Sequence, residues 1–471
     1  MKKMLCIFFI IIFAFTPLMN AFTFNTESEE SDAAETFVTD IQNIMCEPEI
    51  SGAEYGKNSL FNQSEEYYEF SSCKLIVKSK NNINLCGAAD VVSGYNDLWI
   101  LKYNSVEETA AAYEYYSDLE EIEYVEADRI LFALSEEKTT EHTYNSWGPS
   151  YIGLDTLNSS IIESNIPLSE KVVAVLDTGV DSEHPGLNGR IIPTGVNTST
   201  SGERNNCSDD NGHGTQVAGV IIDSTLENVK VRPYKVLDQY GQGTLITLAA
   251  GIIAAINDNV DIINMSIAFS ESSEILKEAV MLAERNNIIM VAASGNDSSD
   301  TLYYPASYKG VLKIGAINES GVIANFSTRG KDIDFAAPGV NIYTTNKGGK
   351  YKTVSGTSFA APLVAGLIAT VISYNSKLSS EDVYYLLCEN AVSVQETDAD
   401  IKYGNGVVYA PSFSDPTVPL SKTDSPYFSH PTAFLREEID LEIFCDTPGT
   451  FTLLDGKVGS IDLYFKAFYV C

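Results

Sequence analysis

Ser358 lies in the stretch VSGTSFAAPLVAGLIATVI, residues 354 to 372, where a Gly-Thr-Ser step comes directly before an apolar run typical of a buried helix. A serine at such a point can cap the helix, because its side-chain oxygen accepts a hydrogen bond from a free N–H group of the first turn. It can also act as a nucleophile, but it then needs a base within hydrogen-bond reach and an acid that orients the base. Residues elsewhere in the chain must decide between these roles.

The candidate base is His213, one of only four histidines in the chain. It lies between two glycines in SDDNGHGTQVAGVII, at the start of an apolar helical run. Flanking glycines let another backbone or a substrate come close, although a structural role for this histidine stays open. His184, in DSEHPG, is better explained as a turn residue before Pro185.

The candidate acid is Asp177, which ends the apolar strand predicted in KVVAVLDTGVDSEHP. Open α/β sheets place their ligand sites at the carboxyl ends of their strands. An aspartate before Thr-Gly can also serve as a turn former, a role that suits Asp181 better.

Three stretches, VLDTGVD, NGHGTQVAG and GTSFAAPLVAG, follow one another in this order and together resemble the subtilisin-like serine proteases, the subtilase family, over roughly residues 145 to 400. The resemblance implies that Ser358 attacks the scissile carbonyl, that His213 takes and returns the proton, and that Asp177 orients the imidazole. A fourth match, VAASGND, implies that the Asn296 amide and the backbone N–H of Ser358 donate to the developing oxyanion.

The resemblance also implies a groove in which the substrate binds as an added strand. The stretch NMSIAF resembles one edge of this groove and YGQG resembles the other. The residues expected along the substrate backbone are Ser266, Ile267 and Ala268 on the first edge and Gly241 and Gly243 on the second.

Some residues depart from the family pattern. Relatives commonly carry glycines at the positions of Ala268 and Phe269, so we expect a Cβ and a ring near the specificity pocket, which Tyr303 is a further candidate to line. Phe359 follows Ser358 where many relatives have methionine. Because a phenyl ring cannot form a sulfoxide, we expect tolerance of mild oxidants unless Cys207 intervenes.

No cofactor is expected for catalysis, and no metal ligand is assigned. The tight calcium site of many relatives uses an aspartate directly after His-Pro and a loop inserted after the catalytic histidine. This chain has Gly186 at that position and no such insertion. We therefore do not predict that site, and structural calcium elsewhere stays open.

The elements around these residues predict an α/β fold. Between about residues 145 and 405, apolar runs without alternation (KVVAVLDTG, VKVRPYKVL, VDIINMSI, NIIMVAAS, GVLKIGA) indicate parallel strands buried on both faces. The stretches GTLITLAAGIIAAIND and SEILKEAVMLAERNN indicate helices between them. We expect a three-layer subtilisin-like catalytic domain over 135–405 with a mostly parallel sheet.

Residues 22–134 predict a small α+β unit, with strands in CKLIVKSK and LWILKYN, a helix in SVEETAAAYEYYSDLEE and a solvated acidic run, NTESEESDAAE. By resemblance this unit is a propeptide of the inhibitor and folding-assistant type. Its ending YVEADRILFAL would lie in the groove, and self-cleavage would fall between Leu134 and Ser135. An independent binding module is the alternative.

The two ends of the chain and its net charge indicate where the protein is located and which partners it can bind. Residues 1–21 combine two lysines, a short apolar stretch and a small residue at Ala21, which predicts a signal peptide and a secreted, extracellular protein. Residues 406–471 pass from a Pro/Ser-rich connector to hairpin-like alternation, which predicts a small β-rich extension. The formal charge of −34 speaks against nucleic-acid partners and anionic membrane surfaces, so no membrane contact is expected after processing. The cysteines outside the signal segment are odd in number and show no C-x-x-C spacing, so disulfides are permitted but not required.

The sequence thus predicts a secreted, self-processing serine endopeptidase whose partners are protein or peptide substrates and its own propeptide. A protease dedicated to one leader peptide or partner remains an alternative, as does a pseudoprotease that only binds peptides. An esterase would need a G-x-S-x-G elbow and an acid that precedes its histidine late in the chain, and the order of the motifs contradicts that.

Overall fold

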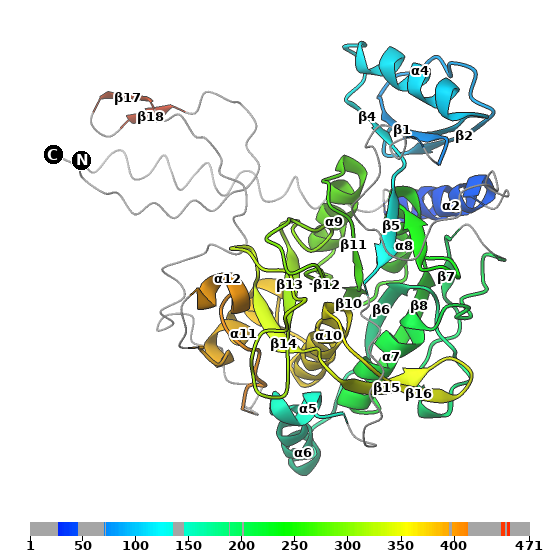
Figure 1. The fold of residues 1–471 in the computed structure, drawn as a ribbon. Coiled ribbons are helices and arrows are strands. Elements are labelled where there is room, and N and C mark those ends of the chain that lie inside the picture. The colour runs from blue at the N-terminus through cyan, green and yellow to red at the C-terminus, as the bar shows by residue number, and fades with distance from the viewer. Residues whose placement is uncertain are drawn as a thin grey trace.

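The computed structural model describes residues 27–45, 70, 72–134, 146–187, 189–199, 202–394, 398–412, 444–447 and 450–452. The predicted signal segment, Ser135 and most of the predicted C-terminal extension lie outside these residues. Within them the chain forms a large α/β unit and a small α+β unit that packs on it (Figure 1).

A seven-stranded parallel sheet forms the centre of the large unit, with strand order β14-β13-β12-β10-β6-β8-β7. Its strands are β6 (Lys171–Asp177), β7 (Val196–Asn197), β8 (Val229–Lys235), β10 (Ile262–Met265), β12 (Ile289–Ala293), β13 (Val311–Ile317) and β14 (Phe335–Pro338). Most of their side chains are buried, because helices cover both faces. The predicted three-layer α/β fold is confirmed.

Alternate residues of β6 show how the two faces are covered. Val173 and Val175 belong to the buried cluster shared with α7 (His213–Ser224) and α10 (Thr357–Tyr374). Their neighbours in the strand, Ala174 and Leu176, belong to the cluster shared with α8 (Leu245–Asn257) and α9 (Glu274–Arg285). Successive side chains of a strand point to opposite faces, so α7 and α10 lie on one face of the sheet and α8 and α9 on the other.

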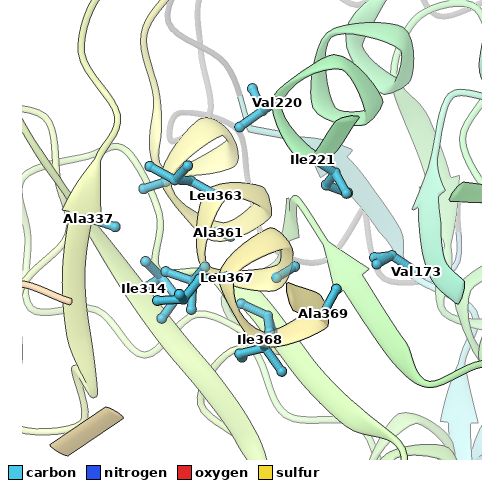
Figure 2. Close-up of a cluster of buried hydrophobic side chains, with 14 of the residues drawn as sticks. Val173, Val220, Ile221, Ile314, Ala337, Ala361, Leu363, Leu367, Ile368 and Ala369 are labelled. Atoms are coloured by element: carbon cyan, nitrogen blue, oxygen red, sulfur yellow. The ribbon is translucent and has the colours of Figure 1, made fainter. Parts of the chain in front are cut away.

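Helix α10 is the central helix of the large unit, and every one of its residues is buried. Figure 2 shows Leu363, Leu367 and Ile368 of this helix in one buried cluster with Ile221 of α7 and Ile314 of the sheet. Among the described residues it is the one helix long and apolar enough to cross a membrane, but here it is the core helix of a folded domain. Its burial holds the first turn, which carries Ser358, in a fixed place.

The small unit is a four-stranded antiparallel sheet of order β2-β3-β1-β4, with β1 (Lys74–Lys78), β2 (Asp90–Tyr95), β3 (Leu98–Lys102) and β4 (Tyr124–Ala127). Leu75 and Val77 pack on its own helix, α4 (Val106–Ser117), whereas Ile76 and Ile100 face the cluster that contains α8 and α9 of the large unit. The sheet is therefore covered on one face by its own helix and on the other by the large unit.

The acidic run near the start of the chain belongs to a helix that was not predicted from the sequence. Residues 27–35 are the first part of helix α2 (Glu27–Met45), in which Ala34, Phe37 and Ile41 are buried. The negative side chains of its first turn favour a helix N-terminus, and residues further along supply the apolar face. The helical period of these apolar residues was therefore the signal that would have predicted α2.

The remaining elements complete the large unit. They are α5 (Gly148–Tyr151), α6 (Leu154–Ser164), the short 3₁₀ helix η2 (Pro185–Leu187), the hairpin of β15 (Ile342–Asn346) and β16 (Lys350–Val354), α11 (Ser380–Asn390) and α12 (Ala399–Tyr403). The packed core continues past the expected domain boundary at 405, because Val408 is fully buried and Ala410 N–H donates to Ile152 O at 2.7 Å. Strands β17 (Phe444–Thr447) and β18 (Thr450–Thr452) form a separate hairpin.

Candidate active site

Asp177, His213 and Ser358 lie together because three elements end or begin at one place. Strand β6 ends at Asp177, helix α7 begins at His213, and Ser358 is in the first turn of α10. The Nδ1 atom of His213 is 2.8 and 2.9 Å from the two carboxylate oxygens of Asp177. On the other side of the ring, Nε2 is 3.3 Å from the carbonyl oxygen of Leu134, which also accepts a hydrogen bond from Ser358 Oγ. All three side chains are buried, and those of His213 and Ser358 contact the same peptide carbonyl group.

The imidazole of His213 is protonated more readily than the imidazole of an ordinary histidine. Burial by itself lowers its pKa, but the charge and hydrogen bond of Asp177, together with the Leu134 carbonyl, outweigh burial and raise the pKa overall. An imidazole in this environment can take a proton from a hydroxyl group and hold it.

Asp209 organises the loop before His213 and was not singled out from the sequence. Its carboxylate accepts hydrogen bonds from Thr178 Oγ1 at 2.9 Å, from Gly212 N at 2.7 Å and from Thr215 Oγ1 at 2.6 Å. Burial raises its pKa, and these hydrogen bonds act against that rise. Asp209 thus ties the residue after Asp177 to the first turn of α7. The Asp-Asp-Asn-Gly run before His213 was the available signal, since such residues form side-chain turns.

Asn296 provides a free donor beside the same carbonyl group. Its Oδ1 accepts from Thr357 N and from Thr357 Oγ1, both at 2.9 Å, which fixes the amide. Its Nδ2 is buried and has no hydrogen-bond partner among the residues that the structure describes. A Cβ added to Gly356 would lie 3.3 Å from Nδ2 and 3.5 Å from Leu134 O, so the donor and the carbonyl border one small space that glycine leaves open. A negatively charged oxygen formed here would meet this donor at a helix N-terminus.

The groove beside the site is occupied by strand β5 (Ile130–Ala133). It forms the middle strand between β11 (Ile267–Ala268) and β9 (Gln242–Thr244), antiparallel to both. In Figure 1 this strand leaves the small sheet and runs down into the large unit. An extended peptide therefore lies in the groove with main-chain pairing on both sides.

All five residues expected along the groove pair with this peptide. Leu134 N donates to Ser266 O at 3.2 Å, and Ala133 N donates to Gly241 O at 2.9 Å. The other three pair in register: Ile267 with Ala133, Ala268 with Phe132, and Gly243 with Leu131.

The Leu134 side chain is buried, with 9% of its surface exposed, in the cluster that also contains Ala268 and Tyr303. The Tyr303 hydroxyl donates to Asp297 Oδ2 at 3.0 Å. The ring of Phe269 lies differently from its prediction, because it belongs to the opposite cluster and packs against Tyr304 with ring centroids 6.0 Å apart. The Cβ expected near the pocket is present at Ala268, whereas the ring that borders this cluster is that of Tyr303.

Two carboxylates of the small unit cap helices of the large one. Glu126 accepts from Ile275 N, near the start of α9, and Asp128 accepts from Ile246 N, near the start of α8, each at 3.0 Å. An anion is stabilised at a helix N-terminus, so both contacts orient the small unit on the large one. Both side chains lie in the stretch YVEADRILFAL, and their capping role was not predicted from the sequence.

His184 and Gly186 have structural surroundings. His184 is buried in the predicted turn, where Nε2 lies 2.6 Å from Lys350 O and Nδ1 accepts from Gly186 N at 3.0 Å. A Cβ on Gly186 would lie 2.6 Å from the Tyr351 hydroxyl. Within the described part of the chain, no cluster of three or more His, Cys, Asp or Glu side chains could hold a metal ion.

A known family and several known proteins are similar in sequence to the part of the chain that contains this site. A family model described as the subtilase family matches residues 169–406. A thermostable alkaline protease of Halalkalibacterium halodurans is 37% identical over 285 residues, which are 58% of this chain and 75% of that protein. An intracellular serine protease of Paenibacillus polymyxa is 38% identical over 256 residues, 50% of this chain and 78% of that protein. Subtilisin E of Bacillus subtilis is 34% identical over 300 residues, 61% and 74% of the two chains.

The family match spans Asp177, His213, Asn296 and Ser358, and subtilisins need no cofactor for catalysis. The seven-stranded parallel sheet is also the kind of sheet that the sequence predicted for this family. The chain belongs to the subtilase family and is a serine endopeptidase.

Proposed function

We propose that this endopeptidase is exported as a zymogen, cuts its own chain between Leu134 and Ser135, and keeps residues 22–134 as a bound inhibitor until they are released. The observation that carries the proposal is the position of Leu134, whose carbonyl oxygen lies against both Ser358 Oγ and His213 Nε2. The alternative of an independent binding module does not explain why residues 130–134 lie in the groove beside Ser358 and His213.

In the proposed reaction Ser358 Oγ attacks the carbonyl carbon of Leu134 while His213 Nε2 takes the hydroxyl proton. Asp177 stabilises the imidazolium through its 2.8 Å contact with Nδ1. The negative charge that develops on the carbonyl oxygen is stabilised by Asn296 Nδ2 and by the N-terminus of α10. His213 then gives the proton to the leaving amine of Ser135, and water releases the acyl group by the same steps in reverse.

The same groove would bind other substrates in the place of β5. Pairing with β9 and β11 recognises the extended main chain of a substrate and not particular side chains. This mode of binding is compatible with a broad range of protein substrates. The burial of Leu134 supports a preference for an apolar residue before the cut bond.

A protease dedicated to one partner is the second candidate, and Tyr303 is the observation that favours it. Its ring fills the space beside Gly295, where an added Cβ would lie 2.6 Å from a ring carbon, and this narrows the pocket. Cleavage of a mixed peptide library would separate the two candidates, since a dedicated enzyme leaves most apolar sites uncut.

Export is proposed from the N-terminal segment and from the family. The stretch at residues 1–21 has the pattern of a signal peptide. One relative is named an intracellular serine protease, so the family alone does not decide location. Recovery of the enzyme from the culture medium, compared with a chain that lacks residues 2–21, tests this part.

The central experiment compares the full chain with its Ser358→Ala variant and reads the N-terminus of each product. We expect a catalytic chain that begins at Ser135 in the first case and an uncut chain in the second. If the active chain remains uncut while folded, or if the Ser358→Ala chain is cut at the same bond, self-processing is wrong.

A further inference from the structure

Helix α2 has an apolar face that is completely covered. Ala34, Phe37, Val38, Ile41 and Ile44 each have at most 3% of their surface exposed. They recur at intervals of three and four residues, so they lie on one side of the helix. An apolar face buried this fully contributes to binding wherever it docks.

This face packs chiefly on α8, a helix of the catalytic domain, and on the edge strand β2 of the small sheet. Its side chains belong to one buried cluster with Ile246, Ala249 and Ile253 of α8. On the sheet side, the ring of Phe37 stacks on Tyr95 with centroids 5.0 Å apart.

Polar contacts of α2 reach the loop that leads to the catalytic histidine. Arg204 donates a hydrogen bond to Thr39 Oγ1, and its guanidinium lies 3.9 Å from the Glu35 carboxylate. The same loop contains Asp209, which is hydrogen-bonded to the first turn of α7. The helix is therefore attached to the catalytic domain at a place distinct from the groove that holds β5.

We propose that α2 is a second anchor of the inhibitor, which docks its apolar face on α8 and holds the small unit on the enzyme after the bond following Leu134 has been cut. The proposal rests on the proposed function, since it concerns the same propeptide. The ligand of the α8 surface is thus an amphipathic helix, here the chain's own residues 27–45, with Glu35 and Asp40 away from the buried face.

A second anchor changes how the inhibitor leaves. If β5 and the small sheet were the only contacts, the inhibitor would be released once both had separated from the catalytic domain. With α2 docked as well, a strand that leaves the groove is held nearby and returns at a high effective concentration. Activation is then governed by α2 and not by the cleavage step.

The test uses the full chain with the adjacent substitutions Phe37→Asp, on the buried side, and Thr36→Asp, on the exposed side. Both place a carboxylate in the same turn of the helix, so the second controls for charge and helix propensity. For each chain one records cleavage at Leu134 by N-terminal sequencing and the time at which activity on a short chromogenic peptide appears. We expect unchanged cleavage and release at least about tenfold faster for Phe37→Asp, with Thr36→Asp like the parent.

Arg204→Ala provides a variant that leaves the apolar face of α2 intact. We expect it to speed release by a smaller factor, about threefold, because an exposed ion pair contributes less than buried apolar surface. If Phe37→Asp and Arg204→Ala both release the inhibitor at the rate of Thr36→Asp, α2 is not an anchor.

A readout that needs no cleavage separates this proposal from the proposed function. In the Ser358→Ala background, amide hydrogen exchange of residues 245–257 reports whether α8 is covered. We expect faster exchange there with Phe37→Asp than with Thr36→Asp. Equal exchange overturns the anchor even if the parent chain is cut, whereas an uncut parent overturns self-processing and leaves the exchange result standing.

Discussion

The Leu134→Ala substitution tests the cleavage site most directly. Leu134 has 9% of its surface exposed, so nearly its whole side chain is removed from water in the pocket. The substitution deletes three carbon atoms, at about 0.8 kcal/mol for each buried group, or about 2.4 kcal/mol in total. If this contact also holds the carbonyl in place during attack, the rate of self-cleavage should fall about fiftyfold.

The assay is a time course of the full chain after refolding, in which the fraction of catalytic chain that begins at Ser135 is measured by gel and N-terminal sequencing. Leu134→Met is the matched control, because it keeps the apolar volume, and its rate should stay within about fivefold of the parent. Circular dichroism of the three chains is the control for equal folding. A Leu134→Ala chain cut at the parental rate and at the same bond would refute the assigned pocket, and so would a Leu134→Met chain as slow as Leu134→Ala.

Three further predictions concern the proposed catalytic side chains and their neighbour Phe359. Asn296→Ala should lower turnover by about 10²–10³ with little change in KM, a magnitude taken from the equivalent subtilisin asparagine and not worked out from this structure; a loss seen only in KM would contradict the role. In NMR titrations of the Ser358→Ala chain, the pKa of His213 should lie above the ordinary histidine value, and Asp177→Asn should lower it because burial then acts without the opposing charge; an unchanged pKa would show that Asp177 does not cause the rise. Activity should survive mild peroxide, because Phe359 cannot form a sulfoxide and burial raises the pKa of the Cys207 thiol to about 11, whereas Phe359→Met should be inactivated within minutes to hours; rapid loss in a Cys207→Ala variant would contradict the reasoning.

The parts of the fold that follow local rules could be predicted from the sequence. Unbroken apolar runs gave the buried parallel strands, and an aspartate at the end of one run gave a side chain at the carboxyl edge, where β6 ends at Asp177. The approach of His213 and Ser358 to that edge followed only from the resemblance to a family. His213 is 36 residues from Asp177 in the sequence, and Ser358 lies much further along the chain, so their spacing does not determine that they meet in space.

Other features depended on contacts between distant segments. Helix α2 was not predicted, because residues 27–35 were interpreted by their charge alone. The spacing of Ala34, Phe37 and Ile41 is typical of a helix and could have predicted it. The direction of the Phe269 ring followed from its packing on Tyr304, which no local pattern describes. The role of Asp209 likewise depends on hydrogen bonds to groups on both sides of the site.

The place of β5 as a middle strand has a consequence for folded substrates. A peptide that replaces it must present both of its main-chain edges to β9 and β11 at once. A segment within a helix or a sheet has those groups already paired, so it must first open locally, at a free-energy cost that differs from one region of a protein to another. Between two substrates with the same residues around the cut bond, the enzyme would therefore cut the one whose segment opens more often, and its rate would report the local stability of its targets.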